Sequence, residues 1–182
     1  MIKGQEMTDM EDKEGKIIGV AQTYQIEPEA EPRVIVVHCS DPRFQRAFDR
    51  FIEKELGLQK GEFVPFVVGG GAGVLAHPER LPKEFKFMKE RFELFRQNYP
   101  SIKRIVLINH EDCAYYKTLK QRVLGVLGQH AQFLLQQPRD DMLLIGQIFN
   151  RFLSHLGYSL ELYYAKFTDE TYSQVVFERI DK

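Results

Sequence analysis

The sequence contains little cysteine and no excess of either charge. Only two of its 182 residues are cysteines, and tryptophan is absent. The 25 Lys and Arg residues nearly balance the 26 Asp and Glu residues, and the formal net charge is −1. This balance argues against a large positive surface of the kind that neutralises nucleic-acid phosphates or an anionic membrane. We therefore expect neither nucleic acid nor a membrane among the partners.

Long apolar runs are also absent, and no run reaches the length needed to span a bilayer. The polar, acidic start, MIKGQEMTDMEDKEGK, lacks the apolar stretch of a secretory signal and the arginine-rich character of a transit peptide. These features favour a cytoplasmic location, where thiols stay reduced. Cys39 and Cys113 could form a disulfide, but in a reducing compartment such a pair is more typical of metal ligands or a nucleophile.

The N-terminal segment differs in character from the rest of the chain. Residues 1–15 are expected either to lack regular structure or to form an arm that docks on something else, and residues 16–26 fit either a short strand or a helix. EPEAEP (27–32) is an acidic segment bounded by proline. We therefore divide the chain into an N-terminal arm with an acidic linker (1–32) and a single α/β domain (33–182).

Apolar runs and helical patterns alternate along the second part. Buried strands are predicted for RVIVV (33–37), EFVPFVV (62–68) and RIVLI (104–108), and Pro65 favours an edge position or a bulge in the second of them. Apolar residues at helical spacing predict helices at 44–56, where Gly57 ends the helix, and at 82–99, 117–136 and 139–156. GGGAG (69–73) is expected to be a flexible loop.

The chain ends in two further segments of strand character. SLELYYAKF (159–167) alternates as a strand does, and TYSQVVFERI (171–180) could pair with it as a hairpin. The order of elements predicts an α/β fold with a central, mostly parallel sheet flanked by helices and a C-terminal strand or hairpin.

Both cysteines follow a predicted strand. The carboxyl ends of parallel strands meet at one edge of a sheet, so CSDPR (39–43) and HEDC (110–113) are expected to lie together. Zinc is bound by thiolate sulfur and imidazole nitrogen, which predicts Cys39, His110 and Cys113 as ligands and Asp41 or water in the fourth position. The alternative is a buried structural cysteine beside a hydrogen-bonded histidine.

The two segments together resemble the β-class carbonic anhydrases. That family carries C-x-D-x-R, found here at residues 39–43, and H-x-x-C, found at 110–113, in this order. The resemblance covers residues 33–116 in detail. It implies a β-carbonic-anhydrase-like fold, with Zn²⁺ held by Cys39, His110 and Cys113, and with Asp41 and Arg43 as the catalytic aspartate–arginine dyad.

The resemblance also implies an activity and a partner. The activity is that of a lyase, the reversible hydration of CO2 to bicarbonate by zinc-bound hydroxide. Asp41 would orient the nucleophile and Arg43 would hold Asp41. The active sites of the family lie at a dimer interface, so a homodimer or higher homo-oligomer is expected.

The sequence departs from the family pattern beside both motifs. Asn109 and Ala114 stand where the family has glycine, and Gly70 and Gly71 stand where it has arginine and asparagine. Tyr115 and Tyr116 could line the pocket or pack in the core. These departures support an alternative, a zinc-binding protein on the same scaffold that does not hydrate CO2. It would be regulatory or structural, or would act on a carbon–sulfur relative of CO2.

Two other motifs fit less well. GAGVLA (71–76) matches the dinucleotide fingerprint G-x-G-x-x-A, but Pro78 cuts off the helix that should receive the pyrophosphate. HCSDPRFQR resembles the cysteine phosphatase signature, but the position of its arginine is taken by Gln45, and the loop lacks the glycines that wrap a phosphate.

Overall fold

The computed structural model describes residues 7–11, 13, 17–22, 24–26, 28–79, 81–118 and 138–180. The chain divides into two compact units, Met1–Ala30 and Glu31–Lys182. In the first unit, strand β1 (Met7–Glu11) pairs antiparallel with strand β2 (Ile17–Gln22). The expectation that residues 1–15 lack regular structure is therefore wrong for Met7–Glu11. The choice left open for residues 16–26 is decided in favour of a strand.

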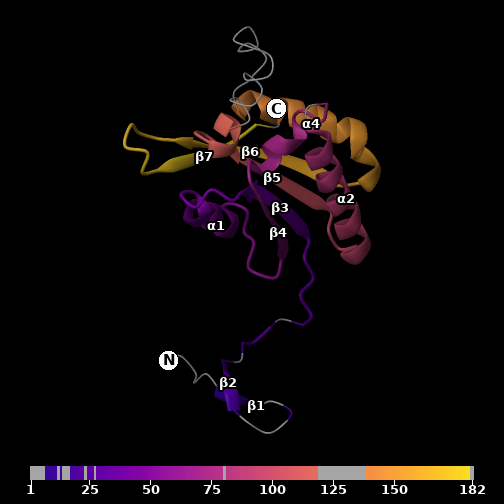
Figure 1. The fold of residues 1–182 in the computed structure, drawn as a ribbon. Coiled ribbons are helices and arrows are strands. Elements are labelled where there is room, and N and C mark those ends of the chain that lie inside the picture. The colour runs from indigo at the N-terminus through magenta and orange to yellow at the C-terminus, as the bar shows by residue number, and fades with distance from the viewer. Residues whose placement is uncertain are drawn as a thin grey trace. The chain divides into compact units, whose positions relative to one another are not determined.

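Five strands form the sheet of the second unit, in the order β4–β3–β5–β6–β7 (Figure 1). The strands are β3 (Val34–Cys39), β4 (Phe63–Val68), β5 (Arg104–His110), β6 (Ser159–Phe167) and β7 (Val175–Arg179). The first four are parallel, and β7 pairs antiparallel with β6 as a hairpin. The predicted α/β fold with a mostly parallel sheet and a C-terminal hairpin is confirmed.

Strand β4 lies at an edge of this sheet, as Pro65 predicts. Proline has no backbone N–H, so a strand that pairs on one side only accommodates it best. Pro65 is opposite Val36 of β3 in the register, and its side chain is exposed.

Helices cover both faces of the sheet. Helix α1 (Gln45–Lys54) packs on one face, and helices α2 (Pro82–Asn98) and α4 (Pro138–Phe152) contribute to the core on the other (Figure 1). The short helix η3 (Ser154–Leu156) follows α4. Three of the predicted helices are thus confirmed, whereas that at 117–136 lies almost entirely outside the described residues. Of the helices that the structure describes, none is long and apolar enough to cross a membrane.

The two cores follow from the alternation of side chains along β3. Ile35 and Val37 belong to the core beneath α2 and α4, whereas Val34 and Val36 belong to the core beneath α1. All six residues of β3 are buried, which explains why the strand reads as a continuous apolar run. Phe48 of α1 is fully buried, and burial of such a ring stabilises the fold by roughly 1.5–3 kcal/mol.

Residues 71–73 are helical, so the expectation of a flexible loop at 69–73 is wrong for these three residues. The 3-10 helix η1 (Gly71–Leu75) begins here, and all five of its residues are buried. A Cβ at Gly71 would lie 2.9 Å from the carbonyl oxygen of Ile108 and 3.0 Å from the nitrogen of Cys39. Gly71 also has φ of +54°, a value that side chains rarely allow. Glycine therefore lets this segment pass directly against the ends of β3 and β5.

The strand order places a topological switch point between β3 and β5. The chain leaves β3 to form β4 on one side, and then crosses to form β5 on the other. Ligands of open α/β sheets bind in the crevice at the carboxyl ends of two such strands. Cys39 is the last residue of β3, and His110 is the last residue of β5.

Candidate metal centre

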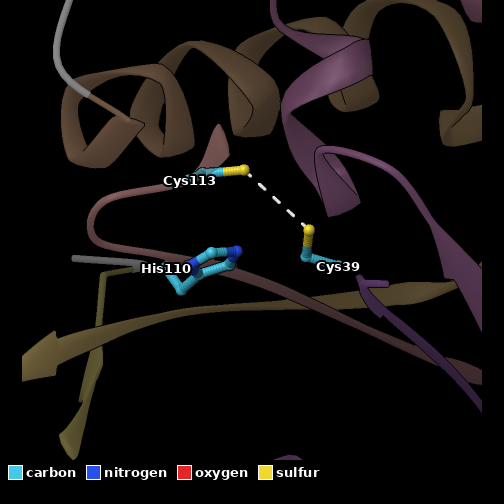
Figure 2. A group of neighbouring side chains, drawn as sticks. All are labelled: Cys39, His110 and Cys113. Carbon is cyan, nitrogen blue, oxygen red and sulfur yellow. Dashed lines mark hydrogen bonds between the residues drawn. The ribbon is translucent and has the colours of Figure 1, made fainter. Parts of the chain in front are cut away.

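Cys39, His110 and Cys113 meet at this switch point. One ligand atom from each of the three buried residues lies within 4.8 Å of the other two. The two sulfur atoms are 3.9 Å apart and form no disulfide. Figure 2 shows the two sulfurs pointing toward one another, with the His110 imidazole beside them. The structure thus brings together the three residues predicted as ligands, in a group that could hold a metal ion.

The His110 ring presents one nitrogen without a partner. Its Nδ1 lies 2.8 Å from the carbonyl oxygen of Glu111, which can only accept a hydrogen bond. Nδ1 must therefore carry the proton, and in the neutral ring Nε2 keeps a lone pair. This Nε2 is buried and has no hydrogen-bond partner among the described residues. A buried, unpartnered acceptor is costly, and a metal ion would satisfy it.

The two thiols share their protons unequally. A hydrogen bond from the Cys113 thiol stabilises the thiolate of Cys39 and lowers the pKa of Cys39. The same interaction, together with burial, raises the pKa of Cys113. Without a cation, the pair therefore ionises once readily and a second time with difficulty. A bound divalent cation would stabilise both thiolates.

Asp41 and Arg43 form the ion pair expected of the dyad residues. Arg43 Nε and Nη2 donate to the two carboxylate oxygens of Asp41, with Nη2 2.7 Å from Oδ2 and Nε 3.1 Å from Oδ1. The backbone N–H of Arg43 also donates to Oδ1. These hydrogen bonds lower the pKa of Asp41, so its carboxylate stays ionised at neutral pH.

Arg43 also joins the turn after β3 to the turn after β5. Its Nη1 donates to Oδ2 of Asp112 over 2.8 Å, and Nη2 donates to the Asp112 carbonyl oxygen over 2.9 Å. Asp112 forms a second ion pair with Lys117. From the sequence, Asp112 is most simply interpreted as a solvated acid in a turn. The structure shows instead that it binds the arginine of the other motif.

Two further residues that the sequence did not single out hold these turns. Gln45 Nε2 donates to the carbonyl oxygens of Cys39 and Asp41, at 2.9 and 2.8 Å. Glu111 accepts a hydrogen bond from the backbone N–H of Phe167 at the end of β6. The role of Gln45 could have been suspected from the sequence, because Gln45 is the first residue of the helix that directly follows the turn, and its amide can donate to the carbonyl oxygens of that turn.

Several residues at which the sequence departs from the β-class pattern, or that lie next to such positions, pack against one another. A Cβ at Gly70 would lie 2.3 Å from the Tyr115 ring, and a Cβ at Gly73 would lie 2.0 Å from the Tyr116 hydroxyl. Asn109, which is fully buried, donates from Nδ2 to the Tyr116 hydroxyl over 3.1 Å. The glycines of residues 70–73 therefore make room for the two tyrosines that follow Cys113.

The remaining histidines near the site have other contacts. His38 packs against the ring of Phe48, and its Nδ1 lies 3.1 Å from the Cys39 carbonyl oxygen. His77 follows η1 and lies 3.2 Å from the buried carboxylate of Asp141. Neither belongs to the group of possible metal ligands among the described residues.

A cavity of about 470 Å³ opens beside the group. Its lining includes Cys39, Asp41, Arg43, Gly70 and Tyr115. A small molecule in this cavity would therefore lie beside Cys39, the ionised carboxylate of Asp41 and Tyr115. The arrangement suits a metal-assisted reaction of a small substrate, in which a charged pair lies beside the metal position.

Comparison with known proteins gives likenesses in structure only. No family model matches the sequence, and no curated protein matches it. A carbonic anhydrase from Glaciozyma antarctica matches with 16% identity and a TM-score of 0.45, over 82% of each chain. β-Carbonic anhydrase isoform I from Trichomonas vaginalis matches with 14% identity and a TM-score of 0.48, over 87% of each chain.

A third match comes from a study of two tetrameric β-carbonic anhydrases of Sordaria macrospora. It has 13% identity and a TM-score of 0.39, and covers 84% of this chain and 82% of the other. The assignment of the site rests on its own residues and distances.

Proposed function

We propose that this chain is a zinc-dependent, β-carbonic-anhydrase-like lyase that catalyses the reversible hydration of CO2 to bicarbonate. The observation that carries the proposal is the convergence of two thiols and an imidazole beside an Asp–Arg ion pair, with the imidazole Nε2 lacking a hydrogen-bond partner in the described part of the chain. The same residues make up the two sequence motifs of the β-class enzymes.

The donor set fits zinc. Two sulfurs each about 2.3 Å from one tetrahedral zinc ion are about 3.8 Å apart. The Sγ atoms of Cys39 and Cys113 are 3.9 Å apart. Thiolate and imidazole are the donors that zinc prefers, whereas magnesium and calcium prefer oxygen. Cys39, His110 and Cys113 would therefore hold the ion and leave one coordination position for another ligand.

The chemistry requires an activated water molecule. Zinc in such a site acts as a Lewis acid and lowers the pKa of a water molecule in its open position toward neutrality. Hydration of CO2 consumes this water and releases one proton for each bicarbonate formed. The protein must therefore orient an oxygen nucleophile, admit CO2 and let the proton leave.

Asp41 is suited to orient the nucleophile. Its carboxylate is ionised, because Arg43 lowers its pKa, and it lines the cavity beside Cys39. An ionised carboxylate can only accept hydrogen bonds, so it would fix the direction of an O–H group in the cavity. Arg43 would hold this carboxylate in place through its two parallel hydrogen bonds.

The proposal is tested by measuring zinc content and CO2 hydration on the same sample of full-length protein. We expect about one zinc ion per chain, and stopped-flow hydration that is lost when the metal is removed by a chelator and restored by zinc. A protein that binds no zinc under these conditions would contradict the proposal.

One observation favours a second candidate, a zinc-binding protein on the same scaffold without hydration activity. The Tyr115 ring packs over Gly70, where the β-class pattern has arginine, and it lines the cavity beside Cys39. This changes the shape and polarity of the pocket without touching the ligands. Zinc near one ion per chain, combined with no measurable hydration, would favour this candidate, which would be regulatory or structural or would act on a carbon–sulfur relative of CO2.

We also propose a homodimer or higher homo-oligomer. Apolar side chains are exposed beside the edge of the sheet, with Val67 of β4 44% exposed and Phe87 of α2 43% exposed. A cavity of about 330 Å³ lies between the same two elements and reaches Tyr115. Light scattering during gel filtration tests this proposal, and a strictly monomeric protein would contradict it.

A cytoplasmic location is supported by the two cysteines that form no disulfide, which a reducing compartment would preserve.

A further inference from the structure

We propose that Asp112 is a positioning residue that keeps the fourth coordination position open by anchoring Arg43. This inference rests on the proposed function, because it concerns what Asp41 does beside a bound metal ion. Asp112 directly precedes Cys113, at the second x of the H-x-x-C motif, a position for which the motif specifies no residue.

The contacts of Arg43 divide between two carboxylates. Nε and Nη2 bind Asp41, whereas Nη1 binds the Asp112 carboxylate and Nη2 also binds the Asp112 carbonyl oxygen. The guanidinium is therefore held from both sides, by the turn after β3 and by the turn after β5. Because its fork is planar, fixing one edge also fixes the direction of the other.

The backbone of Asp112 is shaped for this contact. Asp112 has φ of +56°, in the left-handed region that few residues other than glycine, asparagine and aspartate adopt. In this conformation both its carbonyl oxygen and its carboxylate accept hydrogen bonds from one guanidinium. Lys117 binds the same carboxylate and so restricts its movement.

Anchoring matters because without Asp112 the half-exposed Arg43 side chain would be held less firmly against Asp41. It is 50% exposed, so in the absence of Asp112 it could turn toward water. Asp41 lies two residues after Cys39, and its side chain is only 8% exposed. A buried carboxylate that lost its guanidinium partner would take the nearest cation, and beside Cys39 that cation is the metal ion. Asp112 therefore biases Asp41 toward Arg43 and away from the metal.

The test uses anion binding by the cobalt-substituted protein. Cobalt(II) takes the place of zinc and has an absorption spectrum that responds when azide enters an open coordination position. If Asp41 occupies that position in part of the molecules, the apparent azide affinity falls in proportion to the open fraction. This readout depends on the metal site and not on catalytic activity.

Two variants separate the effect of the hydrogen bond from that of the charge. Asp112→Gly removes the carboxylate and tolerates the positive φ, so we expect cobalt content to be unchanged and azide to bind up to about fivefold more weakly, the upper range for a half-exposed ion pair. Asp112→Asn removes the same charge but keeps an oxygen that can accept from Arg43, so we expect a smaller loss.

The direction of the effect makes the test decisive. Removal of a negative charge near the metal would by itself tighten anion binding, so weaker binding in Asp112→Gly cannot come from the lost charge. Azide affinity equal to or tighter than that of the wild type in Asp112→Gly would overturn this inference alone. A wild-type protein that fails to bind cobalt or zinc would overturn the proposed function as well.

Discussion

The sulfur atoms of Cys39 and Cys113 lie 3.9 Å apart, although 74 positions separate the two residues in the sequence. Three parallel strands and their crossovers are needed to bring them together. Cys39 ends β3, and Cys113 follows β5, the neighbouring strand at the switch point. The fold therefore brings both thiols and His110 to one place.

Cys113→Ala is expected to abolish metal binding. It leaves one sulfur and one imidazole, and the loss of zinc affinity should exceed the roughly 10–100-fold loss that follows removal of an outer hydrogen-bond partner. The variant should also unfold at a lower temperature that added zinc no longer raises. Metal analysis and thermal unfolding with and without zinc check both expectations. Zinc retained at one ion per chain would show that Cys113 is not a ligand.

Asp41→Asn should separate metal binding from activity. Zinc content is expected to stay near one ion per chain, because the amide removes none of the three proposed ligands. The value of kcat/KM for CO2 hydration should fall by about 10²-fold, the scale of a misplaced reacting group. The matched control is Asp49→Asn, which changes an exposed aspartate of α1. An Asp41 variant as active as this control would remove Asp41 from the proposed mechanism.

Gln45→Ala tests whether the turn after β3 is held by a side chain. The substitution leaves the carbonyl oxygens of Cys39 and Asp41 without their shared donor. We expect zinc affinity to fall by about 10–100-fold with little change in helix content, because the ligands themselves remain. Competition with a chromophoric chelator measures the affinity. Arg46→Ala, at the next and exposed position of α1, is the control and should leave the affinity unchanged.

Gly73→Ala tests the packing of the tyrosines on the glycine segment. Its Cβ would lie 2.0 Å from the Tyr116 hydroxyl, which is held by Asn109, and overpacking of this kind costs about 1–3 kcal/mol. In the background of Tyr116→Leu the same substitution should cost at least about 1 kcal/mol less. Denaturant unfolding of the four proteins gives the coupling energy.

Gly57→Ala provides the control for that cycle. Gly57 has φ of +63°, but a Cβ there would meet nothing within 4 Å. The substitution is therefore expected to destabilise the fold through backbone strain alone, by about 1 kcal/mol, with no coupling to Tyr116→Leu. Equal coupling for Gly57 and Gly73 would contradict the proposed contact between Gly73 and Tyr116.

Much of the architecture is encoded in local patterns and could be predicted. The continuous apolar runs of β3 and β5 indicate strands buried on both faces, and Pro65 indicates an edge strand. Phe48 and Ile52 lie one turn apart and mark the buried face of α1. These features depend on the spacing of apolar residues and proline along the sequence, so they can be predicted without knowledge of the tertiary contacts.

The parts that could not be predicted depend on contacts between distant segments. Residues 69–73 look like a flexible loop because glycine allows many conformations, and contacts with distant residues, such as those of Gly70 with Tyr115 and of Gly73 with Tyr116, explain why small residues are needed. Asp112 likewise looks like a solvated turn acid until Arg43 is found beside it. The proximity of Cys39, His110 and Cys113 could be predicted, because these residues end or follow neighbouring parallel strands of one sheet.

The most direct test of the account is X-ray diffraction from the zinc-loaded protein, with anomalous data collected at the zinc absorption edge. We expect one anomalous peak between Cys39 Sγ, Cys113 Sγ and His110 Nε2, with zinc–sulfur distances of about 2.3 Å and a zinc–nitrogen distance of about 2.0 Å. The fourth ligand should be a solvent oxygen, with Asp41 bound to Arg43. A peak elsewhere, or none at this position, would contradict the metal centre and the activity proposed for it.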